Sequence, residues 1–400
     1  MESRGDNYGQ RLDALDGLRG YAALVVVPYH TITGLRPDLI PFLVGTPLLK
    51  MGAADPWLTK LCLTILNGES AVMLFFVLSG FVLTRSIVHD LGRHTAIKAC
   101  LAFAVRRILR IFPSLAACLI VTFVVINAAH SLIPGSGASY SFGQLSANLA
   151  LIDTRLNGAT WTLQIEMLAI PVLLAAGLLI WRCGVAGAIA ALVVALIVTR
   201  SSPLHMDTLF LRHFLLYFIA GALAWALAVR RPEAGRHFVP WWAILAALMT
   251  VNQIGLSPTL ENYVRIALAG WLVAVLATSA SRVLQHPFSA FLGKISYSFY
   301  LWNVLFLNLL FSFRDIFPPW LAQYQALFGI LLAIPVIVAT APLASLVYKH
   351  VELPGIALGK KLSDRILGQD FASREDKHDR PEAVTGKAAR IEARIEAGRS

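Results

Sequence analysis

Three arginines occur within a stretch of the sequence that is otherwise apolar enough for a lipid bilayer. Residues 103–113 read FAVRRILRIFP and contain Arg106, Arg107 and Arg110. An arginine at the centre of a membrane helix costs roughly 2.5 to 3.5 kcal/mol on insertion scales, so these side chains require a reason. Arg107 and Arg110 share a helix face, where two guanidinium groups form a fork suited to phosphate or carboxylate oxygens. The pair is therefore a candidate anion-binding site, with contact to lipid headgroups as the alternative, whereas Arg106 points elsewhere and is expected to meet headgroups.

A second pair of candidate residues lies in the stretch LDGLRGYAALVVVPYH, which contains Asp16, Arg19 and His30. Arg19 and His30 are eleven residues apart, and at 100° per residue their side chains project within about 20° of each other on a helix. The axial separation is about 16 Å, so Arg19 near the membrane surface places His30 deep in the membrane. A neutral imidazole there is a candidate general base, because its free nitrogen can accept a proton. The alternative is a structural histidine bonded to a neighbouring helix.

Other polar side chains interrupt two further apolar stretches. Glu69 and Ser79 stand in GESAVMLFFVLSGFVL, and Trp161 and Glu166 stand in WTLQIEM. A carboxylate that enters an apolar run is costly unless it is paired, so Glu166 could orient an imidazole, bind a substrate hydroxyl or brace two helices. The sequence contains no HExxH, no GxSxG, no glycine-rich phosphate loop and no basic run with interleaved aromatics. These absences argue against a metal site and against nucleic-acid binding.

The overall composition places these residues in a membrane protein. Hydrophobic residues make up 57% of the chain and charged residues 14%, and the mean hydropathy is +0.67. A hydrocarbon core of about 30 Å needs roughly 20 apolar residues to cross it as a helix. The sequence therefore predicts an all-α, polytopic integral membrane bundle of about ten transmembrane helices, at residues 17–33, 70–84, 111–129, 163–182, 184–199, 208–229, 238–254, 263–281, 287–312 and 323–348.

The distribution of basic residues predicts the orientation of the chain. Lys and Arg collect at the N-terminus, between spans two and three, between spans six and seven, and after span ten. Because cytoplasmic loops are enriched in these residues, both termini are predicted to be cytoplasmic. Residues 1–16 are expected to form a leader that is retained, 17–355 the transmembrane domain, and 356–400 a charged, largely disordered tail. The four cysteines lack a CxxC pair and are expected to be small core residues.

Six stretches in order along the chain resemble the membrane-bound acyltransferase family 3. They extend from about residue 12 to 354 and read LDGLRGYAALVVVPYH, FFVLSGFVL, RRILRIFP, WTLQIEM, ISYSFYLWN and YKHVELP. The resemblance implies a ten-helix integral membrane enzyme of the bacterial inner membrane. Members of this family move acyl groups, usually acetyl from acetyl-CoA, onto hydroxyls of sugars, lipopolysaccharide, exopolysaccharide or peptidoglycan.

The resemblance also implies roles for individual residues. His30 matches the family's essential first-helix histidine, and Arg19 matches the basic residue that precedes it. Arg107 and Arg110 match the family's Arg-x-x-Arg pair, and Glu166 matches the acidic residue that ends a Trp-Ser-Leu-like motif.

The sequence departs from the family pattern at two positions. Thr162 replaces the serine of the motif that begins at Trp161, and Asn303 stands where many members carry histidine. No catalytic role is therefore expected for position 303. No additional hydrolase-like domain, of the kind that some members append, is expected from these residues.

The residues and the resemblance agree on a membrane O-acyltransferase. Arg19, Arg107 and Arg110 are expected to hold the phosphates of acyl-CoA on the cytoplasmic side, with no tightly bound cofactor. His30 is expected to deprotonate a hydroxyl of a glycan or glycolipid acceptor, by direct transfer or through an acyl-enzyme. Two alternatives remain open: a transporter or channel for an anion or protons lined by the same residues, and a structural partner in a glycan-assembly complex.

Overall fold

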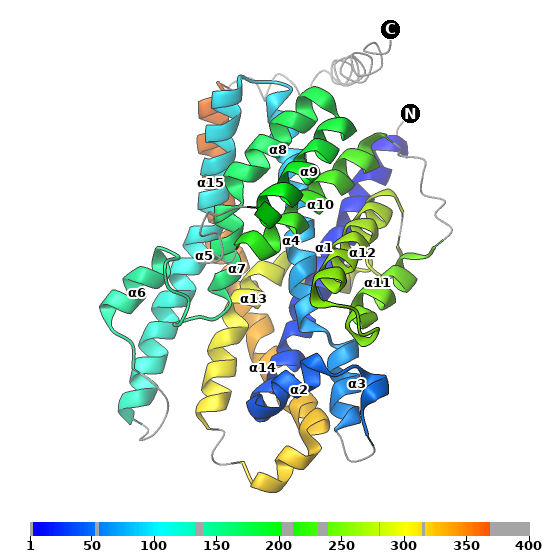
Figure 1. The fold of residues 1–400 in the computed structure, drawn as a ribbon. Helices are drawn as coiled ribbons and strands as arrows, with labels where there is room; N and C mark the ends of the chain where they lie inside the picture. Colours follow the sequence, from blue (N-terminus) through cyan, green and yellow to red (C-terminus); the bar gives the residue numbers. More distant parts are fainter. Residues whose placement is uncertain are drawn as a thin grey trace.

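The computed structural model describes residues 3–52, 56–132, 139–201, 211–230, 239–279, 281–313 and 317–368 (Figure 1). Within these residues the chain forms helices and no strand, which confirms the prediction of an all-α fold. The longer helices are α1 (Ser3–Leu35), α4 (Gly68–Leu91), α5 (Ala96–Leu132), α9 (Val185–Ser201), α10 (Leu211–Arg230), α12 (Pro258–Thr278), α13 (Pro287–Ser312) and α14 (Gln325–Val347). The shorter ones are α2 (Ile40–Gly45), α3 (Trp57–Ile65), α6 (Phe142–Leu149), α7 (Thr160–Leu168), α8 (Ile170–Cys183), α11 (Trp241–Thr250) and α15 (Leu353–Leu367), which follows a π-helical turn, Tyr348–Glu352.

Among the described residues, five helical segments are long and apolar enough to cross a membrane: Trp57–Leu91, Ala96–Leu132, Pro258–Thr278, Pro287–Ser312 and Gln325–Leu367. A sixth is added if α7 and α8, which meet at 45°, count as one span, and Val185–Arg200 and His213–Val229 are shorter apolar helices. Each of the ten predicted segments overlaps a helix, but ten complete crossings stay a prediction. Helix α11 shows why, since its ten residues reach only about 15 Å, half of the hydrocarbon core.

Both ends of the described chain lie at the same end of the bundle, where α1 begins and α15 ends (Figure 1). This agrees with termini on one side of a membrane, and the assignment of that side to the cytoplasm stays a prediction from the basic loops. Helix α1 begins at Ser3 and continues through the predicted leader, whose place outside the membrane stays a prediction.

The structure places residues 356–367 of the predicted tail in a helix, because the chain continues through α15 to Leu367. The buried positions of α15 recur every four residues, so the face that lies against α5 consists of the small residues Gly355, Gly359 and Ser363 and ends at Leu367. Residues 369–400, the remainder of the predicted tail, lie outside the described residues.

Helix α1 lies at the centre of the bundle and contacts α4, α12, α13 and α14. It approaches α13 closely at Gly20 and Gly293, where an added side chain would collide with the facing backbone. Gly80 and Gly221 allow the same approach between α4 and α10. Small residues are favoured at such contacts in membranes, because close packing of backbones replaces the hydrophobic driving force available in water. These contacts fix α1 and α4 as the framework on which the candidate site is built.

Candidate active site

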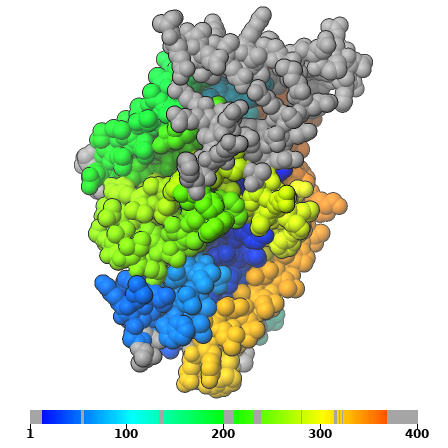
Figure 2. All heavy atoms as spheres, turned by 90° about the vertical axis from the view of Figure 1, so that its right-hand side faces the viewer, coloured from blue at the N-terminus to red at the C-terminus, as the bar shows by residue number. Residues whose placement is uncertain are grey.

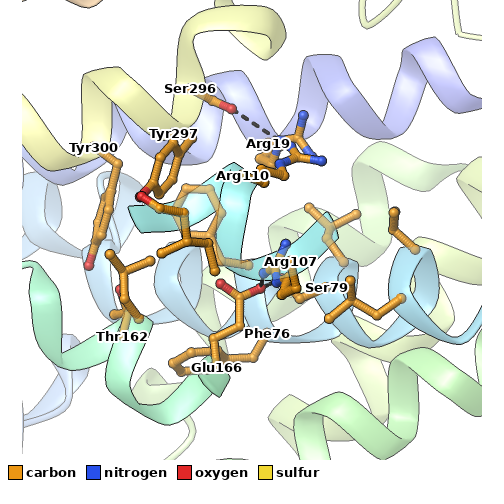
Figure 3. Close-up of a pocket in the computed structure, with 16 residues that line it drawn as sticks. Arg19, Phe76, Ser79, Arg107, Arg110, Thr162, Glu166, Ser296, Tyr297 and Tyr300 are labelled. Atoms are coloured by element: carbon orange, nitrogen blue, oxygen red, sulfur yellow. Dashed lines mark hydrogen bonds and ion pairs between the residues drawn. The ribbon is translucent and has the colours of Figure 1, made fainter. Parts of the chain in front are cut away.

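A cavity of about 90 Å³ lies between α1, α4, α5, α7 and α13 (Figure 3). Its polar lining includes Arg19, Arg107 and Arg110, together with Ser79 and Glu166. The structure thus brings five of the predicted site residues into one place. Pockets for whole small-molecule ligands usually measure roughly 300 to 1,000 Å³. The cavity in this conformation therefore accommodates the end of a chain rather than a complete coenzyme.

Glu166 is held within the cavity by two neighbours. Its carboxylate forms an ion pair with Arg107, and Ser79 Oγ donates a hydrogen bond of 2.6 Å to Glu166 Oε1. The side chains of the ion pair are only 10% (Arg107) and 12% (Glu166) exposed. Because a buried charge requires a partner, this contact explains how both groups are tolerated inside the bundle. The carboxylate is therefore paired with an arginine of α5, and not with the imidazole of His30.

Arg19 borders another part of the cavity and is anchored to α13. Its Nε donates a hydrogen bond of 3.0 Å to Ser296 Oγ, and its Nη2 donates one of 3.4 Å to the carbonyl oxygen of Gly293. Asp16 forms an ion pair with Nη2 at 2.7 Å. These contacts hold the guanidinium at the close approach between α1 and α13.

Arg110 differs from the other two arginines of the cavity. Among the described residues it forms no hydrogen bond and no ion pair, although it lines the cavity beside Arg19 (Figure 3). Its electrostatic neighbours include Arg19, of like charge, and Glu352 and Asp16, of opposite charge. A guanidinium group has five donors and no acceptor, so its preferred partner is an anionic oxygen. Arg110 therefore has donors available for a ligand.

Arg106 does not face lipid headgroups as expected. Its guanidinium forms an ion pair with Asp90 of α4, a hydrogen bond of 3.3 Å with Ser86, and a hydrogen bond with Ser363 of α15. Asp90 is 8% exposed, and a nearly buried carboxylate requires such a partner. Arg106 thus connects α4, α5 and α15.

His30 lies farther along α1 and does not line the cavity. It is exposed, although Val26, Val27 and Thr33, which flank it on the same helix face, are only 3%, 0% and 5% exposed. An exposed side chain among buried neighbours faces an opening in the bundle, and Figure 2 shows α1 (dark blue) visible at the surface between the green α11 and α12 and the orange α14. Pro28 lies two residues before His30 within the helix, where proline removes one intrahelical hydrogen bond.

The two remaining candidates lie outside the cavity. Glu69, at the start of α4, forms an ion pair of 3.5 Å with Arg265 of α12. Trp161 packs against Phe76 and Phe214, with ring centroids 5.9 and 5.2 Å away. Trp161 therefore supports the wall of the cavity from behind. In the described part of the chain, no group of three His, Cys, Asp or Glu side chains could hold a metal ion.

Sequence reasoning missed the contribution of α13 to the site. Ser296, Tyr297 and Tyr300 line the cavity, and Ser298 Oγ donates a hydrogen bond of 2.8 Å to the buried carboxylate of Glu352. The stretch ISYSFYLWN carries four of these hydroxyls, at a spacing that places Ser296 and Tyr300 on one helix face. That pattern of hydroxyls was the signal available in the sequence, and the stretch YKHVELP contains Glu352, the carboxylate that accepts the hydrogen bond from Ser298.

Together these features define an all-helical membrane protein with a charged cavity buried between its central helices. A family model described as an acyltransferase domain, that of acyltransferase family 3, matches residues 12–348. The chain therefore belongs to this family and is a membrane acyltransferase, as the resemblance indicated. Searches of curated proteins and of solved structures each gave no significant match.

Proposed function

We propose that this protein is an O-acyltransferase of the bacterial inner membrane. It takes an acyl group, acetyl in the first instance, from acyl-CoA on the cytoplasmic side and transfers it to a hydroxyl of a glycan or glycolipid acceptor. The observation that carries the proposal is Arg110, a guanidinium without a hydrogen bond or ion pair among the described residues, in a cavity that Arg19 also lines. An anionic group of the donor would supply the missing partner.

The charges around the cavity support an anionic donor. Arg107 is paired with Glu166 and Arg19 with Asp16, whereas the third carboxylate nearby, that of Glu352, accepts a hydrogen bond from Ser298 and forms no ion pair with Arg110 among the described residues. A phosphate of the coenzyme would complete the set by binding Arg110, and Arg19 could turn donors toward the same group. A hydrogen bond to a charged partner contributes about 1.5 to 3 kcal/mol, which is enough to select a phosphorylated donor. Arg107 then acts mainly through Glu166, which it neutralises and positions.

The size of the cavity supports a particular arrangement of the donor. At about 90 Å³ it admits a narrow chain but no nucleotide. The nucleotide of acyl-CoA would therefore remain at the cytoplasmic mouth, and the acyl-bearing arm would extend along α1 toward His30. Arg19 and His30 are about 16 Å apart along the helix axis. The donor would therefore enter at the Arg19 end of this segment, and the acceptor would enter at the His30 end.

The proposed reaction is a direct acyl transfer in which His30 acts as the general base. A nitrogen of the neutral His30 imidazole takes the proton of the acceptor hydroxyl while the oxygen attacks the thioester carbonyl carbon. The carbonyl π electrons move to its oxygen, and the tetrahedral intermediate collapses with cleavage of the C–S bond. The imidazolium then returns its proton to the leaving thiolate, so the products are the acyl ester and free CoA thiol.

The proposal is tested with the full chain purified into lipid nanodiscs. Membranes of the producing strain serve as the acceptor, and release of CoA thiol from acetyl-CoA is followed by its reaction with a chromogenic disulfide. We expect thiol release that requires these membranes and is accompanied by base-labile acetyl groups on their glycans. Mass spectrometry of surface glycans from producing and deletion strains then identifies the acceptor. Acetyl-CoA that stays intact while an anion crosses proteoliposomes would instead establish a transporter.

A further inference from the structure

A second group of charged side chains lies at a distance from the cavity along the same two helices. On α1, Tyr29 follows Arg19 by ten residues, and on α4, Glu69 precedes Ser79 by ten residues. Both offsets correspond to about 15 Å along a helix. Arg19 and Ser79 line the same cavity, and α1 and α4 contact each other, so Tyr29 and Glu69 also lie close together. The contact of Tyr29 with Gly68 confirms it, since a side chain added at Gly68 would meet the Tyr29 ring.

Tyr29 connects this second group to His30. The Glu69 carboxylate is an electrostatic neighbour of the Tyr29 hydroxyl, and the Tyr29 ring lies edge-on to the His30 imidazole with 5.6 Å between ring centroids. A single aromatic side chain thus separates the Glu69 carboxylate from the proposed base.

Arg265 holds the carboxylates of the group. Its Nη2 lies 2.7 Å from Glu261 Oε1, whereas its Nη1 lies 3.5 Å from Glu69 Oε2. The Arg265 side chain is only 9% exposed, and its Nε is buried without a partner among the described residues. A separation of 3.5 Å is too long for a good hydrogen bond, so Arg265 attracts the Glu69 carboxylate without occupying its lone pairs. Glu69 is also 40% exposed, which leaves that carboxylate accessible.

The net charge of the group favours an uncharged ligand. Glu69 and Glu261 are balanced by Arg265 and by Lys60, which is 2% exposed and donates a hydrogen bond of 2.5 Å to the carbonyl oxygen of Leu43. An added cation has no unpaired charge to neutralise, and an added anion would face Glu69. A carboxylate can only accept hydrogen bonds, so the fitting ligand is a neutral molecule that offers hydroxyl donors.

We propose that Glu69, which pairs with Arg265 beside Tyr29, binds the acyl acceptor, and that the acceptor presents an uncharged, polyhydroxylated sugar unit. The Glu69 carboxylate accepts hydrogen bonds from hydroxyls beside the one that His30 deprotonates. This inference rests on the proposed function and adds to it a specific acceptor-binding group and a substrate class.

The first test is a comparison of Glu69→Gln with Glu261→Gln in nanodiscs. Transfer of labelled acetyl from acetyl-CoA to membranes of the producing strain is measured over a range of membrane and donor concentrations. Glu69→Gln should raise the apparent KM for the acceptor about 10- to 100-fold and leave the KM for acetyl-CoA unchanged. Glu261→Gln is the matched control, because Glu261 also pairs with Arg265 but forms no hydrogen bond or ion pair with Tyr29 among the described residues, and its acceptor KM should stay within about twofold of wild type.

The outcomes separate the inference from the function on which it rests. An unchanged acceptor KM in Glu69→Gln, or an equal rise in both variants, would overturn the role of Glu69 and leave an ion-pair network with a structural role only. The unchanged KM for acetyl-CoA shows that the variant is folded. Absence of transfer by the wild-type protein would refute the proposed function itself.

The second test addresses the substrate class by competition. Octyl β-D-glucoside, octyl β-D-glucuronide and 1-octanol, each below its aggregation limit, are added to the wild-type transfer reaction. The glucoside should inhibit at a concentration at least tenfold lower than the other two, and Glu69→Gln should lose that difference. Equal inhibition by octanol and the glucoside would show that sugar hydroxyls are not recognised, and stronger inhibition by the glucuronide would show an anionic acceptor.

Discussion

Arg107 and Arg110 carry the same charge on one helix face, but their different partners predict different consequences of substitution. Arg107→Ala leaves the Glu166 carboxylate, which is 12% exposed, with only the Ser79 hydroxyl as a partner. Removing one member of a buried ion pair costs about 3 to 5 kcal/mol in the free energy of unfolding. Arg110→Ala breaks no hydrogen bond or ion pair among the described residues. We therefore expect the first variant to be destabilised and the second to be as stable as wild type.

Donor binding should show the reverse order, with the larger loss in Arg110→Ala. Arg110→Ala removes a charge-assisted hydrogen bond to a donor phosphate, worth about 1.5 to 3 kcal/mol. At 1.4 kcal/mol per factor of ten, the Kd for acetyl-CoA should rise about 10- to 150-fold. Arg110→Lys should restore part of this affinity, because lysine keeps the charge but lacks the planar fork.

The measurements are thermal unfolding of the nanodisc protein and calorimetric titration with acetyl-CoA. The double variant Arg107→Ala, Glu166→Gln tests the ion pair directly, because the neutral glutamine no longer requires a cation. It should recover about 1 to 3 kcal/mol relative to the sum of the single variants. An Arg107→Ala protein with wild-type Tm, or an Arg110→Ala protein with wild-type donor Kd, would refute the assignment of partners.

Three further predictions follow from the same geometry. His30→Gln should bind acetyl-CoA normally but lose acceptor acylation by about 100-fold or more, because an amide cannot take the proton, and near-normal turnover would make the histidine structural. Arg106→Ala should leave donor Kd unchanged while it destabilises the protein by about 1 to 3 kcal/mol, because it leaves Asp90 without its arginine partner, and a wild-type Tm would contradict this reading. Reporter fusions at Arg93 should report cytoplasm and fusions at Ser139 the opposite side, whereas the same side for both would overturn the predicted orientation.

The long apolar helices were predictable because an uninterrupted apolar run has no other stable form in a bilayer. Helix α15 was not, since its sequence, LPGIALGKKLSDRIL, is rich in charge and resembles a solvated tail. Its buried face consists mostly of small residues at four-residue intervals, and this face can be recognised as a packing surface only once α5 is known to lie opposite. The bend between α7 and α8 was also missed, because the apolar run from 163 to 182 continues through it.

In the candidate site, the sequence predicted which residues share one helix face but not which residues pair between helices. The common face of Arg107 and Arg110 followed from their separation along one helix, and both line the same cavity. The pairing of Glu166 with Arg107 did not follow, because it joins α5 to α7 and depends on how the helices assemble. Sequence reasoning weighed three roles for Glu166, which were to orient an imidazole, to bind a substrate hydroxyl or to brace two helices. The ion pair joins two helices, as the third role supposes, but Arg107 as the partner was found only in three dimensions. The cluster around Arg265 was hidden for the same reason, since its members come from α1, α4 and α12.

Helix α1 carries both an arginine of the cavity and the proposed base, and this gives it a mechanical role. The part of α1 around Arg19 is fixed, because Arg19 is hydrogen-bonded to α13 where Gly20 and Gly293 bring the two backbones together. At Pro28 the helix lacks one intrahelical hydrogen bond, which makes it easier to bend there. The segment after Pro28 is held as well, because Gln325 Nε2 donates a hydrogen bond of 2.8 Å to the carbonyl oxygen of Ile32, so the distance from Arg19 to His30 is set by the geometry of the helix between these two contacts. One inserted residue between Arg19 and Pro28 would lengthen this segment by only about 1.5 Å but turn His30 by about 100°, away from the opening that it faces.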